Sequence, residues 1–413
     1  MKYGCIGEHL GHSFSKEIHN ALAPYEYELC EVERSALDSF MEKHEFSAIN
    51  VTIPYKESVI PHLYYVSDTA KAIGAVNTVV NRDGKLYGYN TDHYGMSALI
   101  RRMGLDLWGK KVAVLGTGGT SKTATAVAKD MGAREVLKVS RNKKDCAVTY
   151  EELYKNHSDT EIIINTTPCG MFPHPHEMPI DLDRLPHISG VVDAVYNPLR
   201  TLLVSEAKKR GINAEGGLYM LVAQAVRASE IFLDTKYSDE DTERVYKKIL
   251  SDKENIVLCG MPGSGKSTVG KLISKKLNRP FFDTDTLITR HTEKQISDIF
   301  AEQGEKVFRD IEEEIIREKV LPLSGVIIAT GGGAILRESN VRALKQNGKL
   351  FFLDRPLREL IPTDDRPLAS TADAIKKRYE ERYDIYKSVS DKQINTKGTP
   401  SKTADEIIKE HTK

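Results

Sequence analysis

The sequence predicts an α/β protein built from two consecutive units. Short apolar runs of β type alternate with helix-like stretches almost from end to end, a pattern typical of parallel sheets covered by helices. Two of the predicted strands run directly into glycine-rich loops, one starting near Lys111 and the other near Asn255. These two loops predict two nucleotide-binding sites.

Length and composition narrow the classes of protein to consider. The chain has 413 residues, which favours two or three domains over one. Because 59 Lys and Arg balance 59 Asp and Glu, the formal net charge is zero, and nucleic acid is not an expected partner. The five cysteines are scattered and form no CxxC pair, which fits a reducing cytoplasm. No apolar run reaches the roughly 20 residues that span a bilayer, so we expect a cytoplasmic protein without a membrane partner.

The order of elements supports this organisation. A polar stretch at 251–254 predicts the boundary between the two units, and a weaker boundary is expected at 107–110. Apolar residues at helical spacing predict helices over Ser121–Met131 and Ser267–Leu277. The expected strands are Ala48–Ile53, Lys111–Leu115, Glu135–Ser140, Glu161–Asn165, Val191–Val195, Asn255–Cys259 and Gly325–Ala329.

Residues 260–268 read Gly-Met-Pro-Gly-Ser-Gly-Lys-Ser-Thr, a complete G-x-x-x-x-G-K-[ST] phosphate loop. Its glycines let backbone N–H groups turn inward around phosphate oxygens, and the following helix adds the positive end of its dipole. Lys266 supplies a cation for the β- and γ-phosphates, and the Ser267 hydroxyl is a ligand for Mg²⁺. A chance glycine turn is the alternative. The expected ATP-binding residues are Gly260, Gly263, Ser264, Gly265, Lys266, Ser267 and Thr268.

Three further features of the C-terminal unit bear on the acceptor: the pair Asp283 and Asp285, Phe308-Arg309, and Gly331-Gly332-Gly333. Two carboxylates on alternate residues of a strand end point to opposite faces. One can therefore face the metal and the other an acceptor hydroxyl. A solvated strand end and a plain tight turn are the alternative interpretations.

Together with the phosphate loop, these features resemble shikimate kinase over about residues 255–413. The resemblance implies ATP and Mg²⁺ as cofactors, with Asp283 near the metal and Asp285 on the shikimate hydroxyls as the base. It implies that Arg309 and Arg382 hold the shikimate carboxylate, since an Arg fork suits a planar anion. For Arg382 alone, an exposed helix charge is an equal alternative. The backbone of Gly331, Gly332 and Gly333 is implied to pack against the ring.

The approach to the lid departs from the family pattern. Arg366 matches the arginine that closes over the phosphates, but residues 358–365 do not align with the family's arginine-bearing approach. Either Arg358 replaces the arginine that stacks on the nucleotide, or that contact is absent.

The earlier glycine loop, Leu-Gly-Thr-Gly-Gly-Thr-Ser at 115–121, approximates the dinucleotide fingerprint, with Ser121 in place of the third Gly or Ala. An NAD site usually has an acidic residue at the end of the next strand. Here Ser140 and Arg141 occupy that place, with Lys143 and Lys144 close by. Cationic groups suit a 2′-phosphate and predict NADP(H). A solvated basic turn is the alternative.

Seven motifs in family order make residues 1–250 resemble shikimate dehydrogenase. They read HSxS, NVTxPxK, GAVNT, GxNTD, NTTPCGM, DAVYNP and GLYMLVAQ. The resemblance implies a substrate-binding lobe from residues 1–107 and 218–250, and a Rossmann-type NADP-binding lobe from residues 108–217. Spacing alone does not bring Lys56 and Asp92 together, and either would most often be a surface charge.

The resemblance also implies residue roles. Lys56 and Asp92 form the catalytic pair, in which Lys56 polarises and protonates the developing alkoxide and Asp92 orients it. The shikimate pocket is implied to consist of Ser13, Ser15, Asn50, Thr52, Asn77, Asp92, Tyr196 and Gln224. The cofactor side is expected to consist of Gly116, Gly118, Gly119, Ser140, Arg141, Lys144, Thr167 and Gly217.

The two resemblances predict a bifunctional enzyme of the shikimate pathway, which leads to chorismate and the aromatic amino acids. It would reduce 3-dehydroshikimate to shikimate with NADPH and phosphorylate shikimate to shikimate 3-phosphate with ATP. One alternative is a quinate/shikimate dehydrogenase that uses NAD, against which Arg141 argues. Another is a weakly active or regulatory shikimate-binding P-loop module, against which the intact Lys266, Ser267, Asp285 and Arg309 argue.

Overall fold

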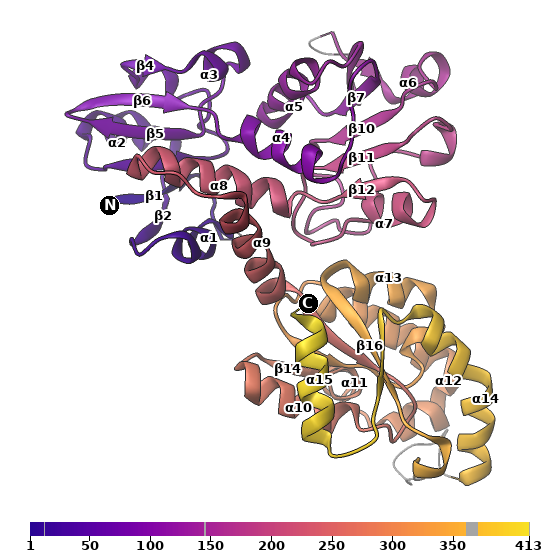
Figure 1. Ribbon diagram of the computed structural model, residues 1–413. Coiled ribbons are helices and arrows are strands. Elements are labelled where there is room, and N and C mark those ends of the chain that lie inside the picture. Colours follow the sequence, from indigo (N-terminus) through magenta and orange to yellow (C-terminus); the bar gives the residue numbers. More distant parts are fainter. Residues whose placement is uncertain (12, 144–145, 361–370, 413) are drawn as a thin grey trace. The chain divides into compact units, whose positions relative to one another are not determined.

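The computed structural model describes residues 1–11, 13–143, 146–360 and 371–412. The chain divides into two compact units, Met1–Ile249 and Leu250–Lys413 (Figure 1). The division falls inside helix α9 (Asp239–Lys253), so the polar stretch expected to separate the units mostly forms the end of a helix.

Unit 1 contains two six-stranded sheets, the first in the order β2-β1-β3-β5-β6-β4. This sheet corrects the expectation of purely parallel pairing, because β5 pairs antiparallel with both β3 and β6. Asp83 and Gly84 have φ of 52° and 76° and join β5 to β6 as a tight hairpin. The strands are β1 (Tyr3–Gly7), β2 (Tyr27–Glu31), β3 (Ala48–Val51), β4 (Tyr65–Val66), β5 (Thr78–Arg82) and β6 (Lys85–Tyr89).

Helices cover both faces of this first sheet. On one face Leu37 and Met41 pack with Ile6 and Ile49, whereas on the other Ala228 packs with Cys5 and other core residues. Helix α8 therefore returns from late in the unit to complete the first lobe. The helices are α1 (Ser15–Leu22), α2 (Leu37–Lys43), α3 (Asp68–Ile73), α4 (Asp92–Arg102) and α8 (Leu218–Leu233).

The second sheet of unit 1 is entirely parallel, in the order β12-β11-β10-β7-β8-β9. Its central strands are buried, as continuous apolar runs in a parallel sheet require. The strands are β7 (Lys111–Leu115), β8 (Glu135–Ser140), β9 (Val148–Thr149), β10 (Ile162–Asn165), β11 (Gly190–Asp193) and β12 (Asn213–Glu215). The helices are α5 (Gly119–Asp130), α6 (Tyr150–Asn156) and α7 (Leu202–Lys209).

Unit 2 is built on a five-stranded parallel sheet in the order β14-β15-β13-β16-β17. Ile273 of α10 and Ile407 of α15 pack in one core cluster of the sheet, and Leu344 of α13 and Tyr386 of α14 in another. The strands are β13 (Asn255–Cys259), β14 (Phe281–Asp283), β15 (Ile327–Ala329), β16 (Gly348–Asp354) and β17 (Lys392–Asn395). The helices are α10 (Lys266–Leu277), α11 (Thr284–Thr292), α12 (Ile296–Ile315), α13 (Glu338–Asn347), α14 (Ala372–Val389) and α15 (Pro400–His411).

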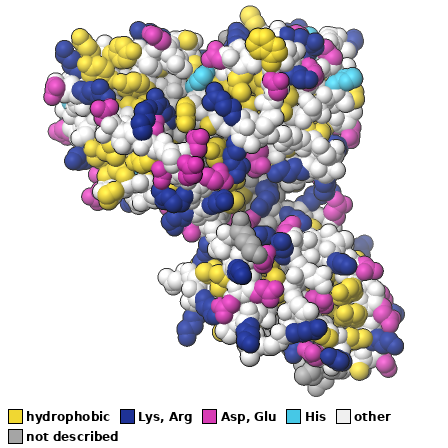
Figure 2. Space-filling model, viewed as in Figure 1, with side chains coloured by type: hydrophobic (Ala, Val, Ile, Leu, Met, Phe, Trp, Pro, Cys, Tyr) yellow, Lys and Arg dark blue, Asp and Glu magenta, His cyan; other side chains and the backbone are white. Residues whose placement is uncertain are grey.

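Acidic and basic side chains are interspersed over the face shown in Figure 2. Within the described ranges, none of the helices combines the length and the apolar character needed to cross a bilayer. All five cysteines carry free thiols.

Candidate active sites

The centre of the first site is an ion pair between a turn and the start of a helix in the substrate lobe. Lys56 lies in the turn after β3, and Asp92 is the first residue of α4. Lys56 Nζ donates to Asp92 Oδ2 at 2.5 Å, and the two side chains are only 18% and 11% exposed. The fold thus brings together two charged groups that lie 36 positions apart in the sequence.

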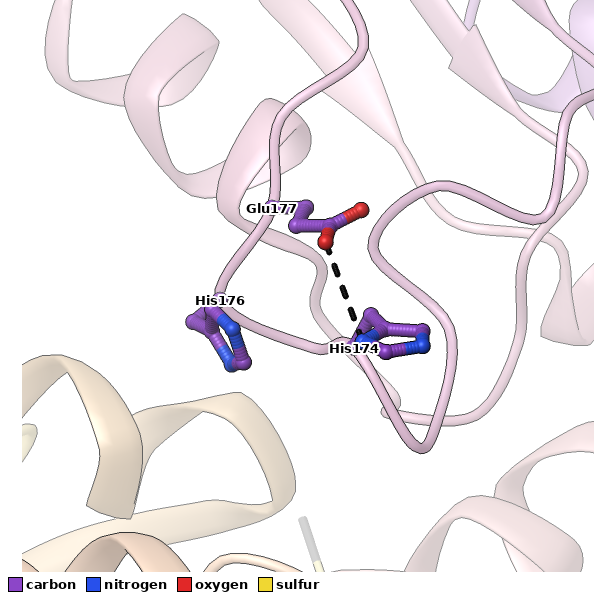
Figure 3. A group of neighbouring side chains, drawn as sticks. All are labelled: His174, His176 and Glu177. Atoms are coloured by element: carbon purple, nitrogen blue, oxygen red, sulfur yellow. Dashed lines mark ion pairs between the residues drawn. The ribbon is translucent and has the colours of Figure 1, made fainter.

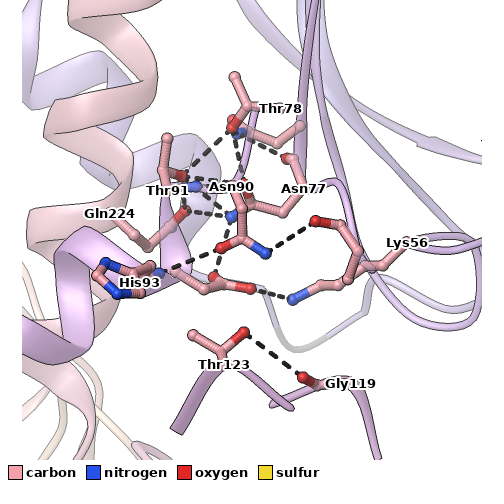
Figure 4. A network of polar contacts seen from close by, with 12 residues as sticks. Lys56, Asn77, Thr78, Asn90, Thr91, His93, Gly119, Thr123 and Gln224 are labelled. Carbon is pink, nitrogen blue, oxygen red and sulfur yellow. Dashed lines mark hydrogen bonds and ion pairs between the residues drawn. The ribbon is translucent and has the colours of Figure 1, made fainter. Parts of the chain in front are cut away.

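An amide network holds Asp92 from its other side (Figure 4). Asn77 Nδ2 donates to Asp92 Oδ1 at 3.0 Å and lies 3.5 Å from Gln224 Oε1. Thr91 donates from its hydroxyl to the same Gln224 oxygen at 3.2 Å and from its backbone N–H to Asn77 Oδ1 at 2.7 Å. Because Asp92 and these three neighbours are buried, the carboxylate is fixed before any substrate arrives. Thr91 was not among the predicted site residues, although it directly precedes Asp92.

Asn50 stands near the end of β3 and extends the same network. Its Oδ1 accepts from the Tyr27 hydroxyl at 2.7 Å, and its Nδ2 donates to Thr78 Oγ1 at 3.2 Å. Thr52 is tied to β1 through its backbone N–H, which donates to Ile6 O at 2.9 Å. Both residues therefore lie at the carboxyl end of β3, just before the turn that carries Lys56.

The two predicted serines flank the start of α1. Ser13 Oγ donates to Ser15 Oγ at 3.0 Å. Between them, the ring of Phe14 meets Tyr196 edge-on at 5.3 Å between centroids. Tyr196 comes from the cofactor lobe, so this contact joins the two lobes of unit 1 beside the serine hydroxyls.

The cofactor loop follows β7 as predicted. Gly116 has φ of 109°, a conformation that favours glycine, and its N–H donates to Val139 O at 2.8 Å. The departure at Ser121 is accommodated, because its buried hydroxyl donates back to Gly116 O at 2.6 Å. A Cβ on Gly118 or Gly119 would meet nothing within 4 Å, so the outer face of the loop at the N-terminus of α5 is open. An open loop at a helix N-terminus fits a pyrophosphate.

The glycine loop lies close to Lys56. Lys122 of α5 donates to Glu57, the residue after Lys56, at 2.7 Å. Figure 4 shows Gly119 and Thr123 of the same helix below the Lys56 side chain in this view. The helix that follows the glycine loop therefore contacts the turn that carries Lys56.

A buried carboxylate, Asp193 at the end of β11, connects the segments that follow β10 and β11 in the cofactor lobe. Asp193 accepts from Asn165 Nδ2 at 2.9 Å and from Thr201 Oγ1 at 2.6 Å. Asn165 in turn accepts from the Thr167 hydroxyl at 2.7 Å. Gly217 precedes α8, and a Cβ there would lie 2.3 Å from Ala194 O, so only glycine fits this close approach.

The basic residues predicted to contact the cofactor follow β8. Arg141 is exposed, and Ser140 Oγ donates to the carbonyl of Asn142. Lys143 pairs with Glu152 at 2.5 Å, so Arg141 is the cation of this turn better placed for a 2′-phosphate. Lys144 lies outside the described residues.

In unit 2 the phosphate loop runs from β13 into α10. Lys266 Nζ donates to the carbonyl oxygens of Gly260 and Met261 at 2.9 and 3.0 Å, which holds the ammonium over the loop. Ser264 Oγ is buried with no hydrogen-bond partner among the described residues. Thr268 is exposed on the first helical turn, and Gly263 and Gly265 have φ of 80° and 93°. This donor set fits a nucleotide phosphate chain.

The two aspartates of unit 2 differ from the predicted strand geometry. Only Asp283 belongs to a strand, whereas Asp285 lies in the first turn of α11. Asp283 caps that helix, because its Oδ1 accepts from the Asp285 N–H at 3.1 Å. Its Oδ2 accepts from the Ser267 hydroxyl at 2.6 Å. Asp283 and Ser267 thus pair as oxygen ligands suited to Mg²⁺, whereas Asp285 follows in the first turn of α11.

A buried ion pair lies beside Asp285. Arg309 Nη1 donates to Glu312 Oε2 at 2.6 Å, and the Glu312 side chain is fully buried. Burial raises the pKa of Glu312, opposed by the Arg309 cation, and Asp285 and Arg382 also act on it. Glu312 was missed from the sequence, although its spacing of three residues from Arg309 on one helix was a usable signal.

Arg382 and the glycine triplet lie beside this ion pair. Arg382 is buried and donates to Gly332 O at 3.3 Å, which disfavours the exposed-charge alternative. Gly331 N–H donates to Thr284 Oγ1 at 2.8 Å. Burial lowers the pKa of Arg382, and the like charge of Arg309 acts in the same direction, so the two guanidiniums lie near each other. Arg366 lies outside the described residues, and Arg358 is exposed.

Fold and site geometry define a two-lobe, dinucleotide-dependent oxidoreductase joined to a P-loop kinase. The family model of the shikimate dehydrogenase substrate binding domain matches residues 5–79, and that of shikimate kinase matches residues 262–412. The chain belongs to the shikimate dehydrogenase family through its first unit and carries a shikimate kinase domain in its second.

Relatives and solved structures agree for the first unit. A shikimate dehydrogenase (NADP(+)) of Clostridium perfringens is 38% identical over 265 residues, which cover 60% of this chain and 97% of the relative. The crystal structure of a Peptoclostridium difficile shikimate dehydrogenase superposes with a TM-score of 0.56 at 33% identity, covering 60% of this chain and 98% of that one. The crystal structure of a chorismate mutase/shikimate 5-dehydrogenase fusion protein from Clostridium acetobutylicum superposes with a TM-score of 0.57 at 34% identity, covering 60% of this chain and 96% of that one. The chain is therefore a bifunctional shikimate-pathway enzyme with oxidoreductase and kinase units.

Proposed function

We propose that unit 1 reduces 3-dehydroshikimate to shikimate with NADPH and that unit 2 phosphorylates the 3-hydroxyl of shikimate with ATP. The observation that carries the first reaction is the largely buried Lys56–Asp92 pair, whose Nζ and Oδ2 are 2.5 Å apart, next to the helix that follows the glycine loop. The product of the first unit is the substrate of the second, which supports both assignments.

In unit 1 the proton comes from the protein. NADPH, when bound, supplies the hydride. Lys56 donates a hydrogen bond from Nζ to the substrate carbonyl oxygen and then transfers that proton to the developing alkoxide. Asp92 holds the Lys56 ammonium in place, because the carboxylate accepts directly from Nζ. The neutral amine left on Lys56 is reprotonated from water.

The polar residues around this pair bind the substrate. Asn77 holds Asp92, Gln224 lies against Asn77, and both offer amide groups to the ring hydroxyls. Ser13 and Ser15 offer hydroxyls to the substrate carboxylate, with Tyr196 beside them. Asn50 and Thr52 offer further polar groups to the substrate from the carboxyl end of β3. Together these groups match a small, polyhydroxylated acid.

In unit 2 the protein positions the acceptor and neutralises charge. ATP with Mg²⁺, when bound, supplies the phosphoryl group and part of the neutralising charge. Asp285 accepts the proton of the 3-hydroxyl, and Arg309 and Arg382 hold the carboxylate at the far end of the ring. Lys266 lies over the phosphate loop, and Ser267 and Asp283 are the proposed metal ligands.

The free cysteines suit a reducing compartment, and we place the enzyme in the cytoplasm.

Reciprocal variants test the residue assignments. Lys56→Ala removes the proton donor and is expected to lower NADPH oxidation by at least about 100-fold. The same variant should phosphorylate added shikimate at the wild-type rate. Asp285→Ala should show the opposite pattern. If either variant silences both activities while its circular dichroism stays unchanged, the two-site assignment is wrong.

A further inference from the structure

A second cluster of ligand-type side chains lies in the loop after β10 of unit 1, at residues that were not assigned to the first active site. His174, His176 and Glu177 are exposed, and one ligand atom from each lies within 4.8 Å of the other two. Figure 3 shows the two imidazoles and the carboxylate at one bend of this loop. His174 Nδ1 and Glu177 Oε1 are 3.7 Å apart.

The local sequence explains why the three side chains converge. Glu177 N–H donates to His174 O at 3.2 Å, so His174-Pro175-His176-Glu177 forms a β-turn. Proline suits the second position of such a turn because its φ is already set. The turn brings its first and last side chains together and places the second imidazole between them in the sequence.

The preceding backbone continues the same pattern of tight turns. His174 N–H donates to Met171 O at 2.8 Å, and Met171 N–H donates to Pro168 O at 3.0 Å. The ligand-bearing turn is thus built on an ordered base, which lowers the entropy lost when an ion is bound.

We propose that His174, His176 and Glu177 bind a divalent transition-metal ion, of which Zn²⁺ is the representative. Two imidazoles are borderline ligands that suit Zn²⁺ and similar ions better than Mg²⁺, and a carboxylate is also a common ligand of Zn²⁺. Three protein ligands leave at least one position for water. Binding requires only modest side-chain rotation, because metal–ligand bonds of roughly 2.0–2.2 Å place neighbouring ligand atoms closer than 4.8 Å.

The site is linked to the cofactor side of unit 1. Cys169 Sγ lies 3.9 Å from Glu177 Oε2, the oxygen not directed at His174. Cys169 N–H donates to Thr167 Oγ1 at 3.3 Å, and Thr167 is a proposed cofactor contact. A bound ion therefore ties down the segment that follows a cofactor-binding residue.

Zn²⁺ binding to the untagged full-length chain tests this proposal. The protein is stripped with EDTA and dialysed against Zn²⁺ with excess Mg²⁺, which occupies oxygen-rich sites of unit 2. Wild type should hold about one more Zn²⁺ per chain than the double variant His174→Ala/His176→Ala. Glu177→Gln should weaken this site by about tenfold or more. His187→Ala removes an exposed histidine of the same unit outside the cluster and should bind like wild type.

Thermal unfolding gives a second readout. Zn²⁺ should raise the unfolding midpoint of wild type more than that of the double variant, because an ion that binds only the folded state stabilises it. Unchanged NADPH oxidation in metal-free buffer shows that the double variant is folded. Equal Zn²⁺ content of wild type and the folded double variant, or an equal loss in His187→Ala, overturns the proposal.

Discussion

Gly333 lies directly against the guanidinium of Arg309. A Cβ placed on Gly333 would stand 2.1 Å from Arg309 Nη2 and 2.3 Å from Nη1 and Cζ. Arg309 is itself clamped by Glu312 at 2.6 Å and Glu305 at 3.2 Å, so it has little freedom to move away. The glycine triplet therefore sets the position of an arginine proposed to bind the substrate carboxylate.

Gly333→Ala should displace Arg309 without touching the phosphate loop. We expect the KM for shikimate to rise by about tenfold or more, because a bidentate carboxylate contact is lost. The Kd for ATP should stay unchanged. Steady-state kinetics and ATP titration measure the two values. A KM for shikimate equal to that of wild type would mean that Arg309 does not bind the substrate.

The predicted preference for NADPH over NADH depends on Arg141. Arg141→Ala removes the exposed cation after β8 and should raise the KM for NADPH by about tenfold, through loss of a charge-assisted contact with the 2′-phosphate. The KM for NADH should change little, since that cofactor lacks the phosphate. Kinetics with both cofactors measure the ratio. A wild-type chain that prefers NADH would instead support the alternative of an NAD-dependent quinate/shikimate dehydrogenase.

Asp193 should make the stability of unit 1 depend on pH. Burial raises its pKa from 3.8 to about 6, although three hydrogen bonds favour the ionised form. Stability from this group is complete below about pH 4 and is lost as the pH rises through about 6, because the unfolded chain releases the proton first.

Asp193→Asn is neutral at every pH and can keep the contacts with Val195, Asn165 and Thr201. Its stability relative to wild type should rise between about pH 4 and 7, by at most about 3 kcal/mol. Unfolding midpoints of the full chain across this range provide the measurement. A constant difference between the two proteins would show that Asp193 keeps its ordinary pKa.

The sequence predicted most strongly those features whose signals are local. The strands Lys111–Leu115, Glu135–Ser140 and Asn255–Cys259 have the observed bounds, because each is a short apolar run ended by a turn. The hairpin at Asp83-Gly84 was overlooked, although Asp-Gly is a strong turn signal. Parallel pairing was predicted for the first sheet because strands alternate with helices along the sequence. That argument applies only where a helix separates two consecutive strands, and no helix separates β5 from β6.

Features that depend on tertiary contacts were less accessible. That Asp92 lies close to Lys56 was predicted from the family resemblance and not from the spacing of the two residues. Asp285 was expected on a strand, because nothing in Phe282-Asp283-Thr284-Asp285 distinguishes a strand end from a helix cap at Asp283. Burial of Glu312 beside Arg309 becomes evident only once α12 is packed.

The central claim is that one chain carries out both reactions. The most direct test supplies the purified enzyme with 3-dehydroshikimate, NADPH and MgATP and identifies the products by mass spectrometry, with each component omitted in turn. We expect shikimate 3-phosphate only when both cofactors are present, and shikimate alone when ATP is left out. Accumulation of unphosphorylated shikimate in the complete mixture would contradict the kinase assignment, and no product in any mixture would contradict both.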